Sequence, residues 1–215
     1  MRNRKNKNLS ITKKDTYRGL PILPAKEGMV INYLDKIYDT FDNALSDHPR
    51  TMAVRVDLRL PLFSSGVSGD VMKRFIASLK AQIDSYLKRK KKNNKRVRQC
   101  NVRYVWVKER NTALSQHYHL VLLFNNDVYN TLGRFGNRDN LSYRIQRAWC
   151  SAVDKDMDEG ARLVHFPENP TYYVDSNSDD FDEQLSDLFE RASYLAKAET
   201  KEYGDRSRSF GCSRR

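Results

Sequence analysis

Residues 52–60 alternate between apolar and charged side chains, and this pattern constrains the fold of the chain more than any other. The apolar set is Val54, Val56, Leu58 and Leu60, and the charged set is Arg55, Asp57 and Arg59. Successive side chains of a β-strand point to opposite faces, so the pattern predicts a strand with one buried face. The chain therefore needs a sheet that is covered on at least one side.

Further strands are expected at residues 102–109 and 117–124, joined through the polar link 110–116 as an antiparallel hairpin. Apolar residues at helical spacing predict helices over residues 29–45, 69–90, 141–153 and 180–201. Short extended pieces are expected at 162–166 and 171–174. Helices interspersed with hairpin strands indicate an α+β fold, a central antiparallel sheet flanked by helices.

The length of 215 residues suits one main hydrophobic core. We expect residues 1–50 to form a basic arm and a helix, and residues 51–215 to form the main domain. No apolar block follows the basic N-terminus, and Cys100, Cys150 and Cys212 lie far apart. These features predict a protein of the reducing cytoplasm, without a membrane span.

A net charge of +12 favours polyanionic partners, because each neutralised phosphate releases condensed counterions. The charge is concentrated in residues 88–98, where eight of eleven side chains are cationic: Lys88, Arg89, Lys90, Lys91, Lys92, Lys95, Arg96 and Arg98. We expect this run to contact DNA, although a solvated loop would have the same composition. Arg55, Arg59 and Arg103 on predicted strands, and Lys201 in the last predicted helix, are further candidates for DNA contact, although the three arginines could equally serve solubility at strand edges.

His117 and His119 lie two positions apart on a predicted strand, so their side chains share a face and can converge on one cation. Such pairs also occur on ordinary exposed strands. Glu109 ends the partner strand and can offer a carboxylate to the same ion, or it can simply balance Lys108 and Arg110. Two nitrogens and one oxygen would leave positions open for water or a phosphate oxygen, as a catalytic metal site requires.

Tyr194 and Lys197 lie three positions apart in the last predicted helix, with Lys201 one turn further along the same face. Residues at this spacing are neighbours on a helix surface. A nearby cation helps a phenol to act as a nucleophile at neutral pH. The same spacing is common in ordinary helices. No pattern assigns a role to His48, and we expect His165 to be a structural histidine or a DNA contact.

In this order, the alternating strand, Glu-x7-His-x-His and Tyr-x-x-Lys resemble the HUH endonuclease superfamily, and most closely the replication initiators of filamentous phages and prophages. The resemblance runs from Arg55 to the C-terminus through RVDLRLP, HYHLVLLFN, LVHFPENP and SYLAKAETKEYGDRSRSFGCS. It implies an HUH fold with RRM-like or ferredoxin-like topology. The superfamily's metal motif falls on His117 and His119 with Glu109 as third ligand, and its nucleophile motif falls on Tyr194 with Lys197 as helper.

The resemblance implies nicking and joining of single-stranded DNA at a replication origin through a 5′-phosphotyrosine, with Mg²⁺ or Mn²⁺ as the ion. It implies rolling-circle replication of a phage or prophage element in a bacterial cytoplasm. A host helicase and polymerase are expected partners, because the chain has no GxxxxGK[ST] motif. Some phage initiators use two tyrosines, but Tyr203 stands nine positions after Tyr194, which favours a single nucleophile.

Three other functions compete with this interpretation. A DNA-binding regulator could keep the fold without catalysis, and a relaxase or transposase would use the same chemistry for another outcome. An RNA-binding module could share the sheet topology, but the paired glycine-aromatic strand motif of that class is missing from the sequence. The amino-acid pattern leaves the origin sequence and the oligomeric state open.

Overall fold

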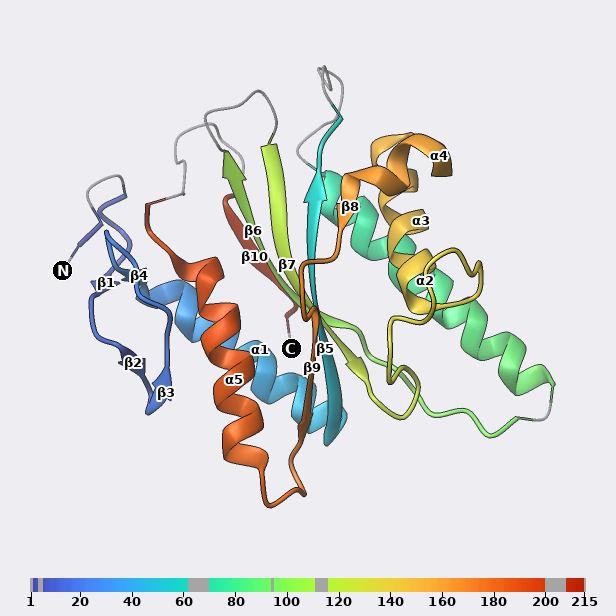
Figure 1. The fold of residues 1–215 in the computed structure, drawn as a ribbon, viewed down its shortest axis with the longest axis horizontal. Helices are drawn as coiled ribbons and strands as arrows, with labels where there is room; N and C mark the ends of the chain where they lie inside the picture. Colours follow the sequence, from blue (N-terminus) through green and yellow to red (C-terminus); the bar gives the residue numbers. More distant parts are fainter. Residues whose placement is uncertain are drawn as a thin grey trace.

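The computed structural model describes residues 2–3, 6–61, 70–93, 95–110, 116–199 and 208–214. Its centre is a six-stranded antiparallel sheet with helices on both faces (Figure 1). The α+β fold expected from the sequence is therefore confirmed.

The sheet has the order β10–β6–β7–β5–β8, and β9 also pairs with β5. Its strands are β5 (Arg50–Arg59), β6 (Arg103–Arg110), β7 (Gln116–Asn125), β8 (Val164–His165), β9 (Thr171–Asp175) and β10 (Phe210–Cys212). From β5 onward the chain follows a strand–helix–strand–strand–helix–strand path, and the order β6–β7–β5–β8 matches the ferredoxin-like arrangement. The predicted hairpin is the antiparallel pair β6–β7.

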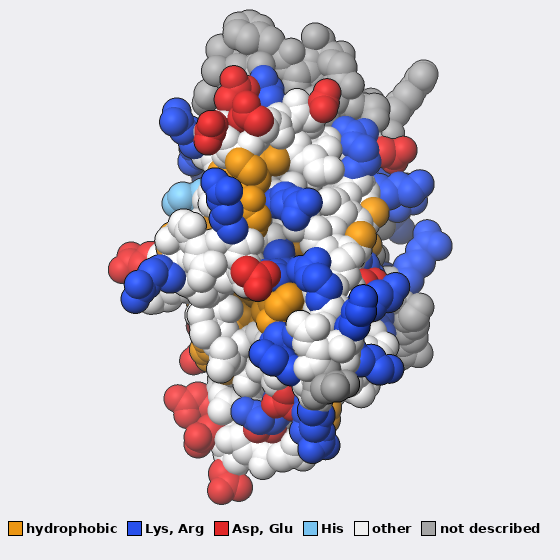
Figure 2. Space-filling view, turned by 90° about the vertical axis from the view of Figure 1, so that its right-hand side faces the viewer, with side chains coloured by type: hydrophobic (Ala, Val, Ile, Leu, Met, Phe, Trp, Pro, Cys, Tyr) orange, Lys and Arg blue, Asp and Glu red, His pale blue; other side chains and the backbone are white. Residues whose placement is uncertain are grey.

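Two cores lie on the two faces of the sheet. Helices α2 (Val71–Lys92) and α3 (Leu141–Val153) cover one face, where Val54, Val56 and Leu58 are buried. Helices α1 (Ile31–Asp47) and α5 (Phe181–Ser193) cover the other face. Because both faces are covered, β7 is buried along its length from Tyr118 to Asn125. The outer side of the α2–α3 layer carries many Lys and Arg side chains (Figure 2).

The N-terminal segment forms short strands that pack beside the α1–α5 layer. They are β1 (Ile11–Thr12), β2 (Thr16–Tyr17), β3 (Leu20–Pro21) and β4 (Met29–Val30). Ile22 and Met29 are buried in the same core as α1 and α5. The proposed division at residue 50 stays a prediction, and the segment before it contributes to the core of the sheet.

Several predicted bounds were wrong. Residues 29–30 are strand, so the first helix begins at Ile31 and extends to Asp47. α2 continues to Lys92, which places Lys88–Lys92 on a helix, and its predicted start at Gly69 lies outside the described residues. The piece predicted as extended at 162–166 begins within a 3-10 turn, η1 (Ala161–Leu163), which follows the short helix α4 (Met157–Gly160).

The largest correction concerns the last helix. The spacing predicts a helix over 180–201, but α5 ends at Ser193 and a 3-10 turn, η2 (Tyr194–Ala196), follows it. Lys197 has left the helical conformation, with φ −54° and ψ 133°. Lys201 and Tyr203 lie outside the described residues. None of the helices within the described ranges combines the length and the apolar composition needed to cross a bilayer.

Candidate metal centre

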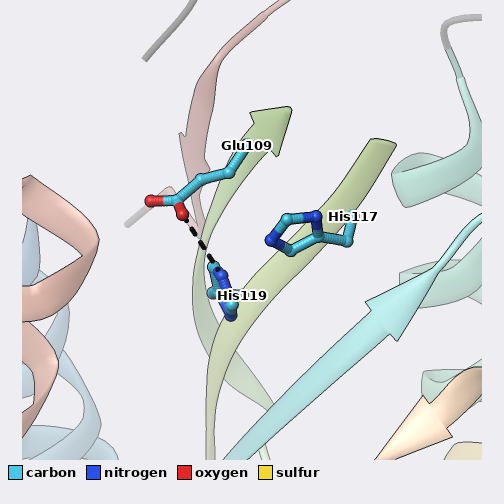
Figure 3. A group of neighbouring side chains, drawn as sticks. All are labelled: Glu109, His117 and His119. Atoms are coloured by element: carbon cyan, nitrogen blue, oxygen red, sulfur yellow. Dashed lines mark ion pairs between the residues drawn. The ribbon is translucent and has the colours of Figure 1, made fainter. Parts of the chain in front are cut away.

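The β6–β7 register brings Glu109, His117 and His119 to one end of one sheet face. Glu109 lies opposite His117 and Val107 lies opposite His119, so the three side chains share a face. One ligand atom from each residue can be chosen so that all three lie within 4.8 Å of one another. Figure 3 shows Glu109 on β6 reaching across to His119 on β7, with His117 beside them. The predicted grouping is therefore confirmed.

The chemistry of the three donors fits a divalent cation, and two of them already have the spacing of neighbouring ligands. Oε2 of Glu109 lies 3.3 Å from Nε2 of His119, and Glu109 is only 2% exposed. Within the described part of the chain, buried Nε2 of His119 makes no well-aligned hydrogen bond, and the Glu109 carboxylate is its ion-pair partner. Neighbouring ligands on an ion at about 2.1 Å are about 3.0–3.4 Å apart, so the Glu109–His119 pair already has coordination spacing.

Asp57 on the neighbouring strand β5 completes the surroundings of His119. The two residues are direct partners across β5 and β7, and Oδ1 of Asp57 lies 2.5 Å from Nδ1 of His119. A carboxylate on one ring nitrogen fixes the tautomer and leaves the other nitrogen to face a metal. Nδ1 of His165 on β8 lies 3.7 Å from the second oxygen of Asp57.

These carboxylates set the protonation of His119. Burial alone would lower the pKa of His119, but Asp57 and Glu109 outweigh it and raise that pKa above its ordinary value. Burial would raise the pKa of Asp57, and the hydrogen bond and charge of His119 lower it overall. Without a cation, the two carboxylates therefore favour the protonated form of His119. A metal ion would replace a proton there.

Tyr194 lies against this group although it is 75 positions further along the chain than His119. The two ring centroids are 5.2 Å apart, with the planes nearly perpendicular. The guanidinium carbon of Arg55 lies 5.1 Å from the tyrosine centroid, and Nζ of Lys197 lies 4.7 Å from it. Burial, followed by the charge of Glu109, raises the pKa of Tyr194, so the resting phenol is neutral.

The N-terminal segment holds the turn that carries Tyr194. The backbone N–H of Leu23 donates to Oγ of Ser193 at 2.9 Å, and the N–H of Ala198 donates to the carbonyl of Gly28 at 3.0 Å. Lys197 forms a β-bridge with Met29. These contacts on both sides of η2 explain why the helix stops at Ser193, where the local sequence has no proline or glycine to end it.

The structure separates the predicted DNA-contacting cations into different regions. Arg55 lies on Tyr194, and exposed Arg59 is the β5 partner of His117. Lys88–Lys92 lie at the C-terminal end of α2, away from the metal group (Figure 1). Contact with DNA stays a prediction for each of them.

The remaining predicted cations differ in how they are held. Arg103 pairs with Asp47 at 2.7 Å and donates to the carbonyl of Arg214 at 2.6 Å. Arg98 pairs with Asp127 at 3.1 Å, and Lys95, Arg96 and Arg98 are all exposed. Arg103 therefore has a structural role, which the sequence did not indicate.

Asp57 is the member of the site that the sequence analysis missed. It belongs to the charged face of the first predicted strand, where Arg55 and Arg59 flank it. The pairing of β5 with β7 brings Asp57 into contact with His119, and no local sequence pattern predicts that pairing.

Residues 12–213 match the family model described as the YagK/YfjJ C-terminal domain. In Escherichia coli (strain K12), uncharacterized protein YfjJ is 37% identical over 194 residues, covering 85% of this chain and 93% of that protein. Uncharacterized protein YagK is 37% identical over 193 residues, covering 86% and 93%. No solved structure matches the chain. The match over most of its length shows that this chain belongs to the YagK/YfjJ C-terminal domain family.

Proposed function

We propose that the chain is a metal-dependent DNA-nicking and joining enzyme of the HUH type, with Tyr194 as nucleophile. The observation that carries the proposal is the ring contact between Tyr194 and His119, since it joins the candidate nucleophile to the candidate metal group. Glu109, His117 and His119 would hold the ion. An ion bound there would supply positive charge to a non-bridging oxygen of the scissile phosphate.

In the proposed reaction Tyr194 attacks the phosphorus atom of a DNA phosphodiester. A bond forms between Oη and phosphorus, and the bond from phosphorus to the 3′-oxygen breaks. The phenolic proton passes to solvent, and the departing 3′-oxygen takes up a proton to become a free hydroxyl. The product is a 5′-phosphotyrosine, and attack by a 3′-hydroxyl reverses the reaction and rejoins the strand.

The surrounding cations suit this step. Arg55 and Lys197 lie within about 5 Å of the Tyr194 ring, one on a strand and one after the turn. Positive charge at this distance stabilises a phenolate and the negative charge that develops on a phosphoryl group. Holding Tyr194 on a turn that is fixed from both sides also reduces the entropy lost in reaching the attack geometry.

We take Mg²⁺ or Mn²⁺ as the ion, because a carboxylate and two imidazoles with open positions suit manganese well. The biological outcome we propose is initiation of rolling-circle replication of a phage or prophage element at a single-stranded origin. A host helicase and polymerase would act as partners. The support for this outcome is the motif order Glu-x7-His-x-His followed by Tyr-x-x-Lys.

The test is a nicking assay on single-stranded oligonucleotides that tile the DNA around the gene of this chain, with Mn²⁺. The variants are Tyr194→Phe and His119→Ala. Tyr173→Phe is the matched control, because Tyr173 is exposed and its hydroxyl donates to the backbone of Asn130.

The proposal expects a slowly migrating protein–DNA adduct from wild type and Tyr173→Phe, and none from the other two variants. Tight binding of DNA without an adduct from any oligonucleotide would contradict the enzyme proposal and favour a DNA-binding regulator. Retention of the adduct by Tyr194→Phe would refute the assignment of the nucleophile.

A further inference from the structure

A pocket of about 310 Å³ lies between α2 and α3, on the side of the sheet opposite to the face that carries Glu109, His117 and His119. Its wall on α2 includes Ser78, Gln82 and Ser85, and its other wall includes Arg138 and Arg147. This is the side of the molecule that Figure 2 shows, with Lys and Arg side chains spread over it.

The pocket carries an excess of positive charge. Arg89, Arg138 and Arg147 are exposed, and within the described residues none of the three is paired with a carboxylate. The acidic residue of the lining, Asp139, already pairs with Arg144 at 2.5 Å. Three guanidinium groups are therefore left to attract an anion.

Arg144 provides a fixed floor for the pocket. It is only 4% exposed, donates to the carbonyl of Asn140 at 2.8 Å and lies 4.3 Å from the ring centroid of Tyr86. Lys90 covers the same ring at 4.6 Å. This ring is therefore not available for base stacking, and the lining offers guanidinium and hydroxyl donors, which suit phosphate oxygens.

The cationic surface continues beyond the pocket along α2. Five of its eight cationic residues, Lys88, Arg89, Lys90, Lys91 and Lys92, stand consecutively at its C-terminal end, beside the pocket. Its last turn adds Lys91 and Lys92, both exposed. A cluster of cations beside the pocket can contact several neighbouring phosphates of a DNA backbone, which suits a duplex better than one small anion.

We propose that the α2–α3 face binds the backbone of duplex DNA, with a phosphate group in the pocket formed by Arg89, Arg138 and Arg147. The inference rests on the proposed function in taking DNA as the ligand. It adds a second contact surface, so that duplex beside the nick is held on one side of the sheet while the single strand reaches Tyr194 on the other.

The experiment measures binding of a fluorescently labelled 30-base-pair duplex of arbitrary sequence by anisotropy, between 50 and 300 mM salt. The variant Arg138→Ala/Arg147→Ala removes two pocket cations. The control Lys13→Ala/Lys14→Ala removes the same charge from exposed positions between β1 and β2. Circular dichroism and Mn²⁺ binding verify that both variants keep the fold and the metal group.

The inference expects at least tenfold weaker duplex binding by the pocket variant, and a loss of about 1.8 from the slope of log K against log salt. The control should change both quantities much less. Equal weakening by the two variants, no weakening by either, or no duplex binding by wild type would overturn the inference. So would pocket-dependent binding to vesicles of anionic phospholipid without pocket-dependent binding to duplex.

The two proposals fail separately. If no oligonucleotide gives a covalent adduct while the pocket variant still loses duplex binding, the nicking proposal fails and the duplex surface stands. If the pocket variant nicks short single strands and binds duplex as wild type does, the nicking proposal stands and the surface fails.

Discussion

Asp57 and His119 form a contact of 2.5 Å between Oδ1 and Nδ1, on the side of the imidazole away from Glu109. The Asp57 carboxylate holds the ring so that Nε2 turns toward Glu109, its ion-pair partner at 3.3 Å. The pairing of β5 with β7 therefore fixes the orientation of His119 within a group that could hold a metal ion.

Asp57→Asn removes the charge of the carboxylate and keeps its size. We expect Mn²⁺ affinity to fall about 10- to 100-fold, because an outer carboxylate raises the basicity of a ligating imidazole and fixes its tautomer. Isothermal titration calorimetry measures the change. Asp42→Asn, on an exposed position of α1, is the matched control and should bind as wild type does. Unchanged affinity in Asp57→Asn would mean that Asp57 does not support the ligand.

Metal should stabilise the fold through Glu109. At a Mn²⁺ concentration 100 times the dissociation constant, binding contributes about 2.7 kcal/mol, which raises the Tm of a chain of this length by about 5–10 °C. Glu109→Gln and His117→Ala should abolish the rise, and a chelator should reverse it in wild type. Differential scanning fluorimetry measures the Tm of each variant with and without Mn²⁺. An equal rise in the Tm of Glu109→Gln would mean that the ion binds elsewhere.

Gly28 tests the close packing of β1 against the residue before β4, whose carbonyl accepts a hydrogen bond from the N–H of Ala198. Its φ is +85°, and a Cβ there would come within 2.5 Å of the Thr12 carbonyl oxygen. Gly19 has φ +81° with open space around it, so Gly19→Ala measures backbone strain alone, about 1–2 kcal/mol. We expect Gly28→Ala to lower the free energy of unfolding by at least about twice as much, because it adds a steric clash to the strain. Urea denaturation compares the two, and equal losses would contradict the close approach.

His48 should make stability depend on pH near neutrality. Burial lowers its pKa below the ordinary 6.5, and its Nε2 accepts a hydrogen bond from the N–H of Asn101 at 2.9 Å. The unfolded chain therefore takes up a proton at higher pH than the folded chain. The contribution of neutral His48 to the free energy of unfolding is complete above pH 6.5. It is lost as the pH falls from 6.5 to the pKa of His48 in the folded chain. His48→Gln should remove this part of the pH dependence, measured by urea denaturation at several pH values between 7.5 and 5. If the free energy of unfolding of His48→Gln changes with pH as it does in wild type, His48 is not its source.

Local pattern was enough for the three long strands β5, β6 and β7 and for the grouping of Glu109 with the histidine pair, but it did not indicate β10 or the N-terminal strands. The alternation in residues 52–60 and the hairpin of β6 and β7 follow from period-two side-chain geometry, and they bring Glu109 to the histidine pair. Helix bounds were less accurate because tertiary contacts decide them. α5 stops at Ser193 because Gly28 and Met29 bind the chain just beyond it, and nothing near Ser193 in the sequence signals that contact.

Two features of the site depend on contacts between distant segments. Asp57 contacts His119 because β5 pairs with β7 in the sheet. The amino-acid sequence alone does not indicate this strand order. Tyr194 was singled out by the order of the motifs. Its predicted contact with Lys197 is present, although the segment is a 3-10 turn and not an α-helix. The pocket between α2 and α3 is lined by residues from a helix, a loop and a second helix, so no single sequence motif predicts it.

The most direct test of the central claim is to digest the protein–DNA adduct and map the nucleotide-bearing residue by mass spectrometry. The account predicts a nucleotide linked through phosphate to the peptide that contains Tyr194, formed only when Mn²⁺ or Mg²⁺ is present. A nucleotide on another tyrosine, or an adduct that forms equally well with a chelator, would contradict it.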